Sequence, residues 1–293
     1  LADAFHSIPK FSQNRLQVTI YVAPTIESYS LNKFTFTLPS ANHDTLRLSV
    51  WQDSPFCQNN QNRCQAKPTI QLKDSYLYLL TLGQFNMTGF ILKSRNSNIE
   101  VEWPKTMILK NLSFSDIETT KPFVSVRDAN SVVLADIEIG SNKLGPIFEY
   151  SRTLKEVIPQ ISLQNTTMNG NRDMDELFAG IALFSFDATI DSEKQGRIDI
   201  NDVKFNNEDL KQSFVKIRGF EDVKVANMKI EKSLLTFLDN INSLMDIQGV
   251  KRVELQEINI EKSQMKGENS ASSFISLQDV KDLVIREFNI MSN

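Results

Sequence analysis

Carboxylates are the side chains of this sequence with the clearest capacity for chemistry, and one group of them lies in a polar stretch. Asp187, Asp191 and Glu193 stand close together along the chain. Two neighbouring carboxylates are what acid/base cleavage of a glycosidic bond requires. Because residues 187–197 are mostly polar, we interpret the group as part of a solvated loop.

A second group, in residues 169–176, places side-chain oxygens at alternate positions, as calcium-binding loops do. The glycine that an EF-hand loop needs at its sixth position is replaced by Met174. The chain has only two histidines, His6 and His43, and it contains no Gly-rich phosphate loop, Gly-x-Ser-x-Gly or His-Glu-x-x-His motif. We therefore expect neither a metal site nor a cofactor.

Both cysteines of the chain, Cys57 and Cys64, lie in a polar segment rich in Asn and Gln. This spacing predicts a disulfide that closes a small hairpin, and with it an oxidising compartment. The alternative is a pair of reduced loop cysteines. A zinc site is not expected, because no further ligand lies nearby in the sequence.

Three Asn-x-Ser/Thr sequons offer acceptor sites for N-linked glycans, at Asn86, Asn165 and Asn111. Their number is no more than the Asn, Ser and Thr content predicts by chance, so their positions carry more information. Asn86 is expected at an outward-facing strand position, which makes it the best candidate. The other two are expected at corners, where the side chain can be committed to backbone hydrogen bonds.

Charge and hydropathy argue against two function classes. The 293 residues carry 32 basic and 36 acidic side chains, well mixed, for a net charge of −4, so no nucleic-acid footprint is expected. No apolar run approaches the ~20 residues of a membrane-spanning helix. The chain has no initiator Met and no secretory signal pattern at residue 1, so we expect a processed or excerpted segment of something longer. An artificially trimmed segment is the alternative.

The dominant pattern is an eight-residue repeat: apolar, any, apolar, any, Asn, apolar, any, apolar. It is clearest in residues 223–230 and recurs at intervals of 25 to 37 residues, a period that indicates a solenoid. The copies are predicted to begin at Leu80, Met107, Val132, Ile161, Ile198, Val223, Val253 and Leu283.

Both halves of each copy alternate with the period of a β-strand, but the phase slips by one residue between them. A bend at the slip keeps the apolar side chains of both halves inward. Asn and Asp suit such a bend, because they tolerate left-handed backbone angles. We name this position the corner column, and its Asn and Asp members are Asn111, Asp136, Asn165, Asp202 and Asn227. Gln84, Glu257 and Glu287 fill it in the other copies.

Stacked coils would bring residues 30 apart to the inter-strand spacing of about 4.8 Å. One outward column would then be Asp222, Arg252 and Asp282, and Lys224 would lie beside Glu254. A further inward strand is predicted upstream of several copies, ending at corner residues Asp128, Gly219, Gly249 and Asp279.

Short strands in coils of 25–30 residues, apolar columns and an Asn/Asp corner resemble the right-handed parallel β-helix of pectin-lyase-like proteins. The resemblance covers about residues 70–293 and implies an all-β solenoid of about eight to ten coils with an irregular N-terminal part. A leucine-rich repeat is the alternative, but its Asn would come one position later and a helical half-repeat is lacking. The Asn-rich, Gly-poor composition is also similar to large β-helix surface proteins of protists.

The catalytic motifs of polygalacturonase-like enzymes are absent from this sequence. Asn165-Thr-Thr stands where those enzymes have Asn-Thr-Asp, no Asp-Asp pair occurs, and no histidine follows His43. Lys216-Ile-Arg218 matches their last motif only in reverse. These departures argue against enzymatic activity and make no residue a catalytic candidate.

Two regions are expected. Residues 1–69 would form an irregular, capping β region that contains the Cys57–Cys64 loop, and residues 70–293 would form the parallel β-helix. Residues 1–10 are predicted to include a short helical lead that covers the open end of the first coil, because natural proteins avoid uncovered strand edges. A separate small β domain at the N-terminus is the alternative.

The sequence predicts a non-enzymatic extracellular segment, secreted or at the cell surface, with a structural or adhesive role. Its expected partners are further copies stacked end to end in a filament, or neighbouring domains of a longer chain, with carbohydrate as another candidate. The alternative function is a carbohydrate-active enzyme or polysaccharide-binding module of the same fold.

Overall fold

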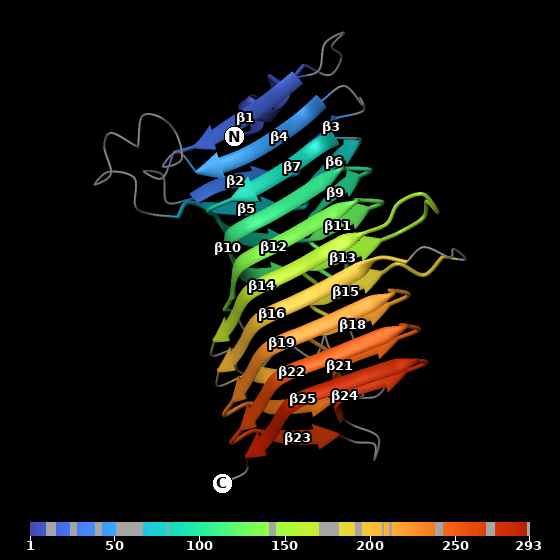
Figure 1. Ribbon diagram of the computed structural model, residues 1–293. Coiled ribbons are helices and arrows are strands. Elements are labelled where there is room, and N and C mark those ends of the chain that lie inside the picture. Colours follow the sequence, from blue (N-terminus) through green and yellow to red (C-terminus); the bar gives the residue numbers. More distant parts are fainter. Residues whose placement is uncertain are drawn as a thin grey trace, which may run out of the picture.

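The computed structural model describes residues 1–9, 16–23, 28–38, 43–50, 67–80, 82–140, 145–169, 182–190, 195–206, 208–210, 213–237, 243–267 and 273–291. These residues form one short helix and 25 strands, and every strand pair is parallel (Figure 1). The predicted all-β parallel β-helix is confirmed. The leucine-rich repeat alternative is wrong, since the only helix among the described residues is α1 (Ala2–His6).

Sheet A forms the largest wall of the solenoid, and ten of its strands follow one another along the axis. They are β1 (Leu16–Val22), β4 (His43–Val50), β7 (Leu82–Thr88), β10 (Thr106–Glu118), β12 (Ser131–Ile139), β14 (Gln160–Asn169), β16 (Arg197–Asn206), β19 (Asp222–Glu231), β22 (Arg252–Glu261) and β25 (Asp282–Met291). Three others branch from this path: β2 (Ser28–Asn32), β5 (Thr69–Lys73) and β8 (Ile91–Arg95). Ten successive strands agree with the predicted eight to ten coils.

Two further sheets close the coils. Sheet B has nine strands: β3 (Thr35–Leu38), β6 (Tyr76–Leu80), β9 (Asn98–Glu102), β11 (Val124–Arg127), β13 (Phe148–Ser151), β15 (Phe184–Asp187), β18 (Val215–Arg218), β21 (Ser243–Gln248) and β24 (Ser273–Gln278). Sheet C has three strands near the C-terminus: β17 (Asp209–Leu210), β20 (Leu234–Phe237) and β23 (Gln264–Gly267). The repeat pattern does not predict sheet C.

The bend in the long strands occurs at the corner column. Asn111, Asp136, Asn165, Asp202 and Asn227 have φ angles between 50° and 56°, in the left-handed region that Asn and Asp tolerate. The position predicted for the first copy is wrong: Phe85, not Leu80, pairs with Met107, so the bend of that coil falls at Gly89 (φ 87°) and not at Gln84. Residues 85–92 also obey the repeat, with Gly taking the place of Asn.

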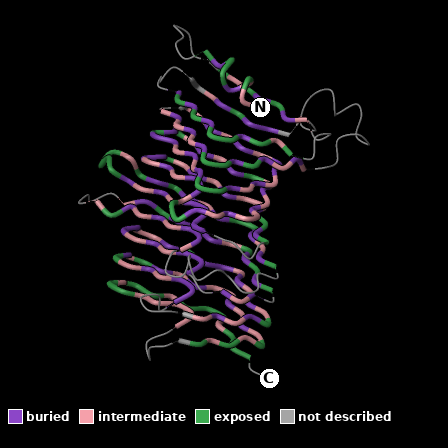
Figure 2. The backbone as a smooth tube through the Cα atoms, turned by 180° about the vertical axis from the view of Figure 1, so that it is seen from behind, coloured by how far each residue is buried: buried purple, intermediate pink, exposed green. Residues whose placement is uncertain are grey.

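Apolar side chains form straight columns inside the solenoid. Val223, Val253 and Leu283 are directly paired from strand to strand, as predicted. A second column runs through all ten sheet A strands on the main path: Ile20, Leu48, Met87, Leu109, Leu134, Leu163, Ile200, Val225, Leu255 and Ile285. Figure 2 shows this buried interior continuing from coil to coil. Burying each such side chain contributes about 1.5–3 kcal/mol, so these columns supply most of the stability.

The strands before residue 69 belong to the same sheets as the strands after it. β1 pairs with β4, which pairs with β7, and β3 pairs with β6. The parallel stacking therefore begins at β1. Helix α1 lies against this first coil, with Phe5 buried and its ring 5.3 Å from that of Phe36.

Candidate functional site

Three surface regions of the described structure could carry function. They are a groove on the outer face of sheet A, a polar cluster on the outer face of sheet B, and the C-terminal end of the solenoid. Each is built by stacking, which brings residues about one coil apart into contact. The sections of chain that supply them are therefore distant in sequence.

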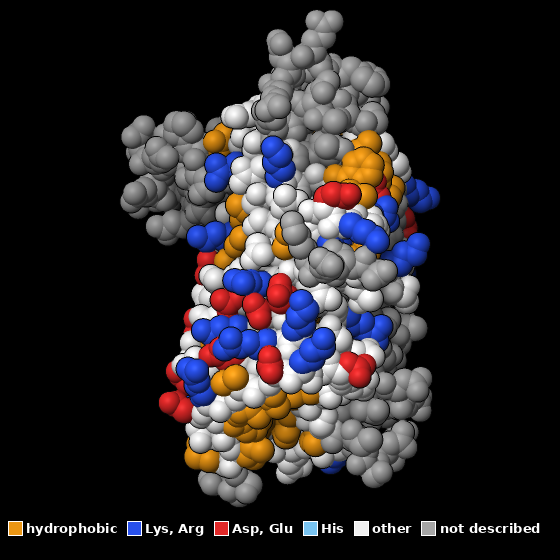
Figure 3. Space-filling model, turned by 45° about the vertical axis from the view of Figure 1, so that its right-hand side comes forward, with side chains coloured by type: hydrophobic (Ala, Val, Ile, Leu, Met, Phe, Trp, Pro, Cys, Tyr) orange, Lys and Arg blue, Asp and Glu red, His pale blue; other side chains and the backbone are white. Residues whose placement is uncertain are grey.

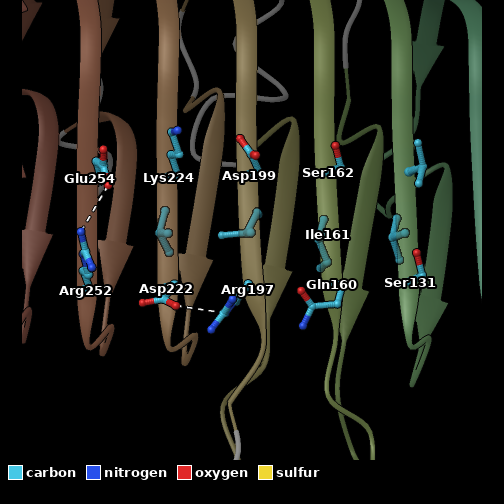
Figure 4. Close-up of a pocket in the computed structure, with 14 residues that line it drawn as sticks. Ser131, Gln160, Ile161, Ser162, Arg197, Asp199, Asp222, Lys224, Arg252 and Glu254 are labelled. Carbon is cyan, nitrogen blue, oxygen red and sulfur yellow. Dashed lines mark hydrogen bonds and ion pairs between the residues drawn. The ribbon is translucent and has the colours of Figure 1, made fainter.

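The groove on sheet A has a volume of about 480 Å³ and crosses strands β12, β14, β16, β19 and β22. Figure 4 shows its outward side chains arranged in two rows. One row contains Ser131, Gln160, Arg197, Asp222 and Arg252, and the other contains Ser162, Asp199, Lys224 and Glu254.

The charges of this groove alternate in sign, and four of them form ion pairs with one another. Arg197 Nε lies 3.0 Å from Asp222 Oδ2, and Arg252 Nη2 lies 3.4 Å from Glu254 Oε2. The register that places Asp222 beside Arg252 and Lys224 beside Glu254 is the predicted one. Exposed pairs of this kind contribute about 0–1 kcal/mol each. The Arg197–Asp222 pair therefore joins adjacent coils, and four of the charged groups of the groove are already engaged with one another.

The cluster on sheet B combines two tyrosines with two glutamates and an arginine. Tyr76 Oη donates a hydrogen bond to Glu100 Oε2 at 2.5 Å, and Tyr78 Oη donates one to Glu102 Oε2 at 2.7 Å. Arg127 lies between the carboxylates, in contact with Glu102 and with its Nη2 3.6 Å from Glu100 Oε1. The hydrogen bond to Glu102, reinforced by burial, raises the pKa of Tyr78 to about 12. Burial and the bond to Glu100 also raise the pKa of Tyr76.

Beside this cluster, a groove of about 310 Å³ is lined by Glu100, Lys121, Ser125, Arg127 and Glu149, among others. Glu149 faces the same side of sheet B as Glu100, two strands further along. Burial and the neighbouring carboxylate of Asp187 raise the pKa of Glu149, and Arg127 partly offsets them. Ionisation of Glu149 therefore has a net cost in free energy in the folded chain.

Trp103 stands at the corner directly after Glu102. It adopts a left-handed backbone angle (φ 59°), which is unusual for a bulky residue. Its side chain is 46% exposed, which makes it one of the most exposed large apolar side chains among the described residues. An exposed aromatic next to a tyrosine–carboxylate cluster provides both stacking and hydrogen-bonding surface.

The C-terminal end exposes the inside of the solenoid. Leu283, Ile285, Ile290 and Met291 of β25 are between 47% and 63% exposed, although Leu283 and Ile285 belong to inward columns. Figure 3 shows hydrophobic side chains gathered at the lower end of the molecule, where Figure 1 places the C-terminal strands. β25 and β24 are the last strands of sheets A and B, so their outer edges lack a neighbour in the described structure.

The three sequons occupy different environments. Asn86 is half-buried on β7, and its Oδ1 is buried without a hydrogen-bond partner among the described residues. Asn111 is half-buried at its corner. Asn165 is exposed, and its amide nitrogen, the atom that would carry a glycan, donates a 2.7 Å hydrogen bond to Asp136 Oδ1 of the adjacent coil. Glycosylation at these positions stays a prediction.

The corner column forms partial side-chain ladders. Asn165 bonds to Asp136, and Asn227 Nδ2 donates to Asn201 Oδ1 at 2.9 Å. These bonds join side chains of adjacent coils, whereas the sequence suggested bonds to the local backbone. The corner column is therefore an element of the scaffold as well as a surface feature.

Several predicted features lie outside the described residues. Cys57 and Cys64 are among them, so the predicted disulfide is untested. Asp191, Glu193 and the 170–176 part of the proposed calcium loop also lie outside. Within the described part of the chain, no group of three or more His, Cys, Asp or Glu side chains could hold a metal ion.

Sequence reasoning missed the sheet B cluster and the open end. Tyr76 and Tyr78 stand two residues apart, as do Glu100 and Glu102, and this alternation could have marked two outward strand faces. Their meeting depends on the sheet B register, which the repeat did not reach before residue 123. No described helix is both long enough and apolar enough to cross a membrane. No protein-family model, curated protein or solved structure matches this chain.

Proposed function

We propose that this chain is a non-enzymatic extracellular β-helix segment with a structural or adhesive role, joined to its neighbours through the end of the solenoid. The observation that carries the proposal is the exposed C-terminal coil. Leu283 and Ile285 are 47% and 52% exposed, yet their equivalents one coil earlier, Val253 and Leu255, are at most 2% exposed.

Covering Leu283 and Ile285 would remove their apolar surface from contact with water. Each fully buried Leu or Ile contributes about 1.5–3 kcal/mol, and Ile290 and Met291 enlarge the same patch. Among the described strands, β24 and β25 each end a sheet, and natural proteins ordinarily cover such edges. An apolar end with free strand edges favours a partner that adds strands to the sheets.

The walls of the solenoid support a structural role. Arg197 Nε lies 3.0 Å from Asp222 Oδ2 of the adjacent coil, and Lys251 Nζ lies 3.5 Å from Glu221 Oε1 of its neighbouring coil. These pairs stabilise the stacking of coils.

Sedimentation velocity tests the proposal directly. The weight-average mass of the intact chain should rise with concentration, and Ile285→Lys should abolish the rise because it places a charge in the apolar end. Leu154→Lys is the matched control, since Leu154 is 41% exposed but lies in the segment between β13 and β14. A chain that stays monomeric at every concentration would overturn the proposal.

A second candidate function, polysaccharide binding, is favoured by the sheet B cluster. Tyr76, Tyr78 and the exposed Trp103 offer aromatic surface, and Glu100 and Arg127 offer polar groups beside a groove. Aromatic faces with a few polar groups are typical of small-ligand sites. Glu149, with its raised pKa, could supply the acid that the enzyme version of this alternative needs.

Affinity electrophoresis in gels that contain neutral or acidic polysaccharides tests this second candidate. Binding should retard the native chain and should weaken in Trp103→Ala. Leu154→Ala removes an apolar side chain of similar exposure and should leave migration unchanged. Equal migration of all three proteins in every polysaccharide would exclude sugar binding at this cluster.

A further inference from the structure

Away from the last coil, the exposed large apolar side chains of the described structure gather at one corner. Three of the four, Trp103, Leu154 and Ile158, are between 37% and 46% exposed and lie there. Trp103 follows β9 directly, and the other two belong to the segment 152–159, which links β13 to β14. Val157 of the same segment is half-buried. We name Trp103, Leu154, Val157 and Ile158 the corner ridge.

Stacking of the coils places Trp103 beside the segment 152–159. The amide of Trp103 donates a 2.8 Å hydrogen bond to Arg127 O, which continues the pairing of β9 with β11, so Trp103 lies opposite Asp128. Asp128 in turn accepts a 2.8 Å hydrogen bond from the amide of Leu154 on the next coil. The corner ridge therefore spans about two inter-strand spacings, roughly 10 Å along the solenoid axis.

Buried charged groups hold the backbone of the corner ridge in place. Asp128 is buried, and its Oδ1 also accepts a 2.6 Å hydrogen bond from the amide of Thr153. Arg152 is buried as well, and it donates from Nε to Leu154 O at 3.1 Å and from Nη2 to Lys155 O at 2.7 Å. Hydrogen bonds of ionised groups are stronger than those between neutral groups. A fixed backbone thus presents the apolar side chains, so binding through them has a small ordering cost.

The corner ridge projects from the molecule and is not a groove. Figure 1 shows the link between β13 and β14 standing out from the side of the solenoid. None of the four side chains lines the groove on sheet A or the groove beside the tyrosines. A projecting apolar edge has to enter its partner, and the boundary between headgroups and acyl chains of a lipid bilayer receives such an edge.

The charges that border the corner ridge fit an anionic lipid surface. Lys105 and Lys155 are exposed, and no ion pair joins them to another described residue. Glu156 is the one carboxylate of the segment 152–159, so these three exposed side chains carry a net charge of +1, whereas the whole chain carries −4. Tryptophan is enriched at the headgroup level of membranes. Lysines reach the headgroups with their long stems while neighbouring apolar side chains insert.

We propose that the corner ridge inserts into the interface of a lipid bilayer that carries anionic headgroups, so that the solenoid rests on the membrane along this corner. The contact goes beyond the proposed function, because it gives the segment a lipid surface in addition to a protein neighbour. It uses neither end of the solenoid. Only side chains of a fixed turn and one tryptophan enter the bilayer, so the binding is peripheral and reversible.

Fluorescence of Trp103 tests the insertion. Trp51 is the only other tryptophan, so Trp51→Phe leaves Trp103 as the single reporter. Its emission should shift to the blue when phosphatidylcholine vesicles that contain phosphatidylserine are added, and lipids brominated on their acyl chains should quench it. Vesicles of phosphatidylcholine alone should give a smaller shift, because Lys105 and Lys155 then lack anionic partners. An emission maximum that no vesicle changes would overturn the proposal.

Vesicle flotation, with the native chain as the reference, tests which residues make the contact. Leu154→Ser/Ile158→Ser should lower the bound fraction several-fold, and Lys105→Gln/Lys155→Gln should remove the preference for anionic vesicles. The matched control is Tyr21→Ser, which removes a side chain as exposed as Ile158 from β1, three sheet A strands before β10. It should bind vesicles as the native chain does. Equal flotation of the Leu154→Ser/Ile158→Ser variant and the native chain would refute the proposal.

The outcomes separate this proposal from the proposed function. Ile285→Lys, which should stop the association of chains, should leave vesicle binding unchanged. If Ile285→Lys abolishes flotation and Leu154→Ser/Ile158→Ser does not, the membrane contact lies at the last coil and the corner ridge is not the lipid site. If Trp103→Ala loses polysaccharide binding while vesicles leave the Trp103 emission unchanged, Trp103 binds sugar and the lipid proposal is wrong.

Discussion

The two ends of the second apolar column differ in solvent exposure more than any two neighbouring positions in its middle. Ile20, in the first coil, is 8% exposed, and Ile285, in the last, is 52% exposed. The side chains are identical and the strands pair in the same way. The difference comes from the N-terminal residues: Phe5 of α1 and Ile8, just after the helix, pack in the core at the first coil, whereas no described element covers the last. Terminal coils of a solenoid thus depend on caps that the repeat itself does not contain.

Removal of the N-terminal cap should have the largest effect on this comparison. Phe5→Ala should lower the free energy of unfolding by about 3–5 kcal/mol, the usual cost of truncating a buried Phe. It should also make the N-terminal end adhesive, because Ile20 and Phe36 lose their cover. Chemical denaturation measures the first effect and light scattering the second. Asp3→Ala, at an exposed position of the same helix, should change neither by a comparable amount. Equal stability of Phe5→Ala and the native chain would refute the capping role.

Shortening two side chains of the second apolar column, one in its middle and one at its C-terminal end, compares how much each contributes to stability. Leu255→Ala should cost about 2–5 kcal/mol, since Leu255 is 2% exposed. Ile285→Ala, one coil on, should cost less than about 1.5 kcal/mol, because about half of its side chain is already in water. Both are measured by urea denaturation in dilute solution, where association is absent. A cost at Ile285 equal to that at Leu255 would mean that the last coil is covered even in the monomer.

Replacing Thr166, in the middle of the solenoid, should have a smaller effect on the free energy of unfolding and should raise it. Thr166 follows the corner on β14, is fully buried and has no hydrogen-bond partner for its hydroxyl among the described residues. The equivalent residues of adjacent coils are Ile137 and Val203. Thr166→Val should therefore stabilise the chain by about 1–2 kcal/mol, since it removes an unsatisfied buried hydroxyl at nearly constant volume. Thr167→Val, at the half-buried outward neighbour, should give no such gain. Because Thr167 belongs to the sequon at Asn165, the proteins are compared without glycosylation. Thermal unfolding of the two variants measures this difference in stability.

The smallest expected effects concern two carboxylates on the walls of the solenoid, Glu149 and Glu138, whose pKa values are shifted in opposite directions. Burial, with Asp187, raises the pKa of Glu149, so its contribution to stability is present below the ordinary Glu pKa and is lost as pH rises through the raised folded value. The hydrogen bond from Ser113, with Lys67, lowers the pKa of Glu138, so its contribution is present above the ordinary value and is lost as pH falls through the lowered one.

Glu149→Gln should accordingly stabilise the chain at neutral pH, and Glu138→Gln should destabilise it, each by less than about 1 kcal/mol. Unfolding free energies measured from acid to neutral pH should show opposite changes of slope for the two variants. Parallel pH profiles of the two variants would show that these assignments are wrong.

Much of the fold could be predicted because the repeat is written in the sequence. Alternation about an Asn or Asp corner is a local property: Asp136, Asn165 and Asp202 each interrupt an apolar pattern at the point where the backbone turns left-handed. The first copy was predicted at Leu80 and not at Phe85 because Gly89 replaces the usual Asn there, while the residues just before Phe85 imitate the start of a copy. Sheet C was missed because its strands are only two to four residues long.

The candidate sites were less predictable, since they depend on register and on the ends. Tyr78 meets Glu102 and Glu149 approaches Arg127 only because sheet B stacks strands that are 22 or more residues apart. The exposure of Ile285 has no sequence signal of its own: it obeys the same pattern as Leu255. Only the presence or absence of a covering element distinguishes the two.

The stacking described above also sets how the molecule would respond to force. The backbone hydrogen bonds between coils point along the solenoid axis, and each coil contacts only its neighbours. Tension applied to the two termini would load the bonds of one coil at a time. The chain should thus extend in a series of similar steps, each releasing one coil, because each inner strand of the sheet A path is held by a described neighbour on both sides.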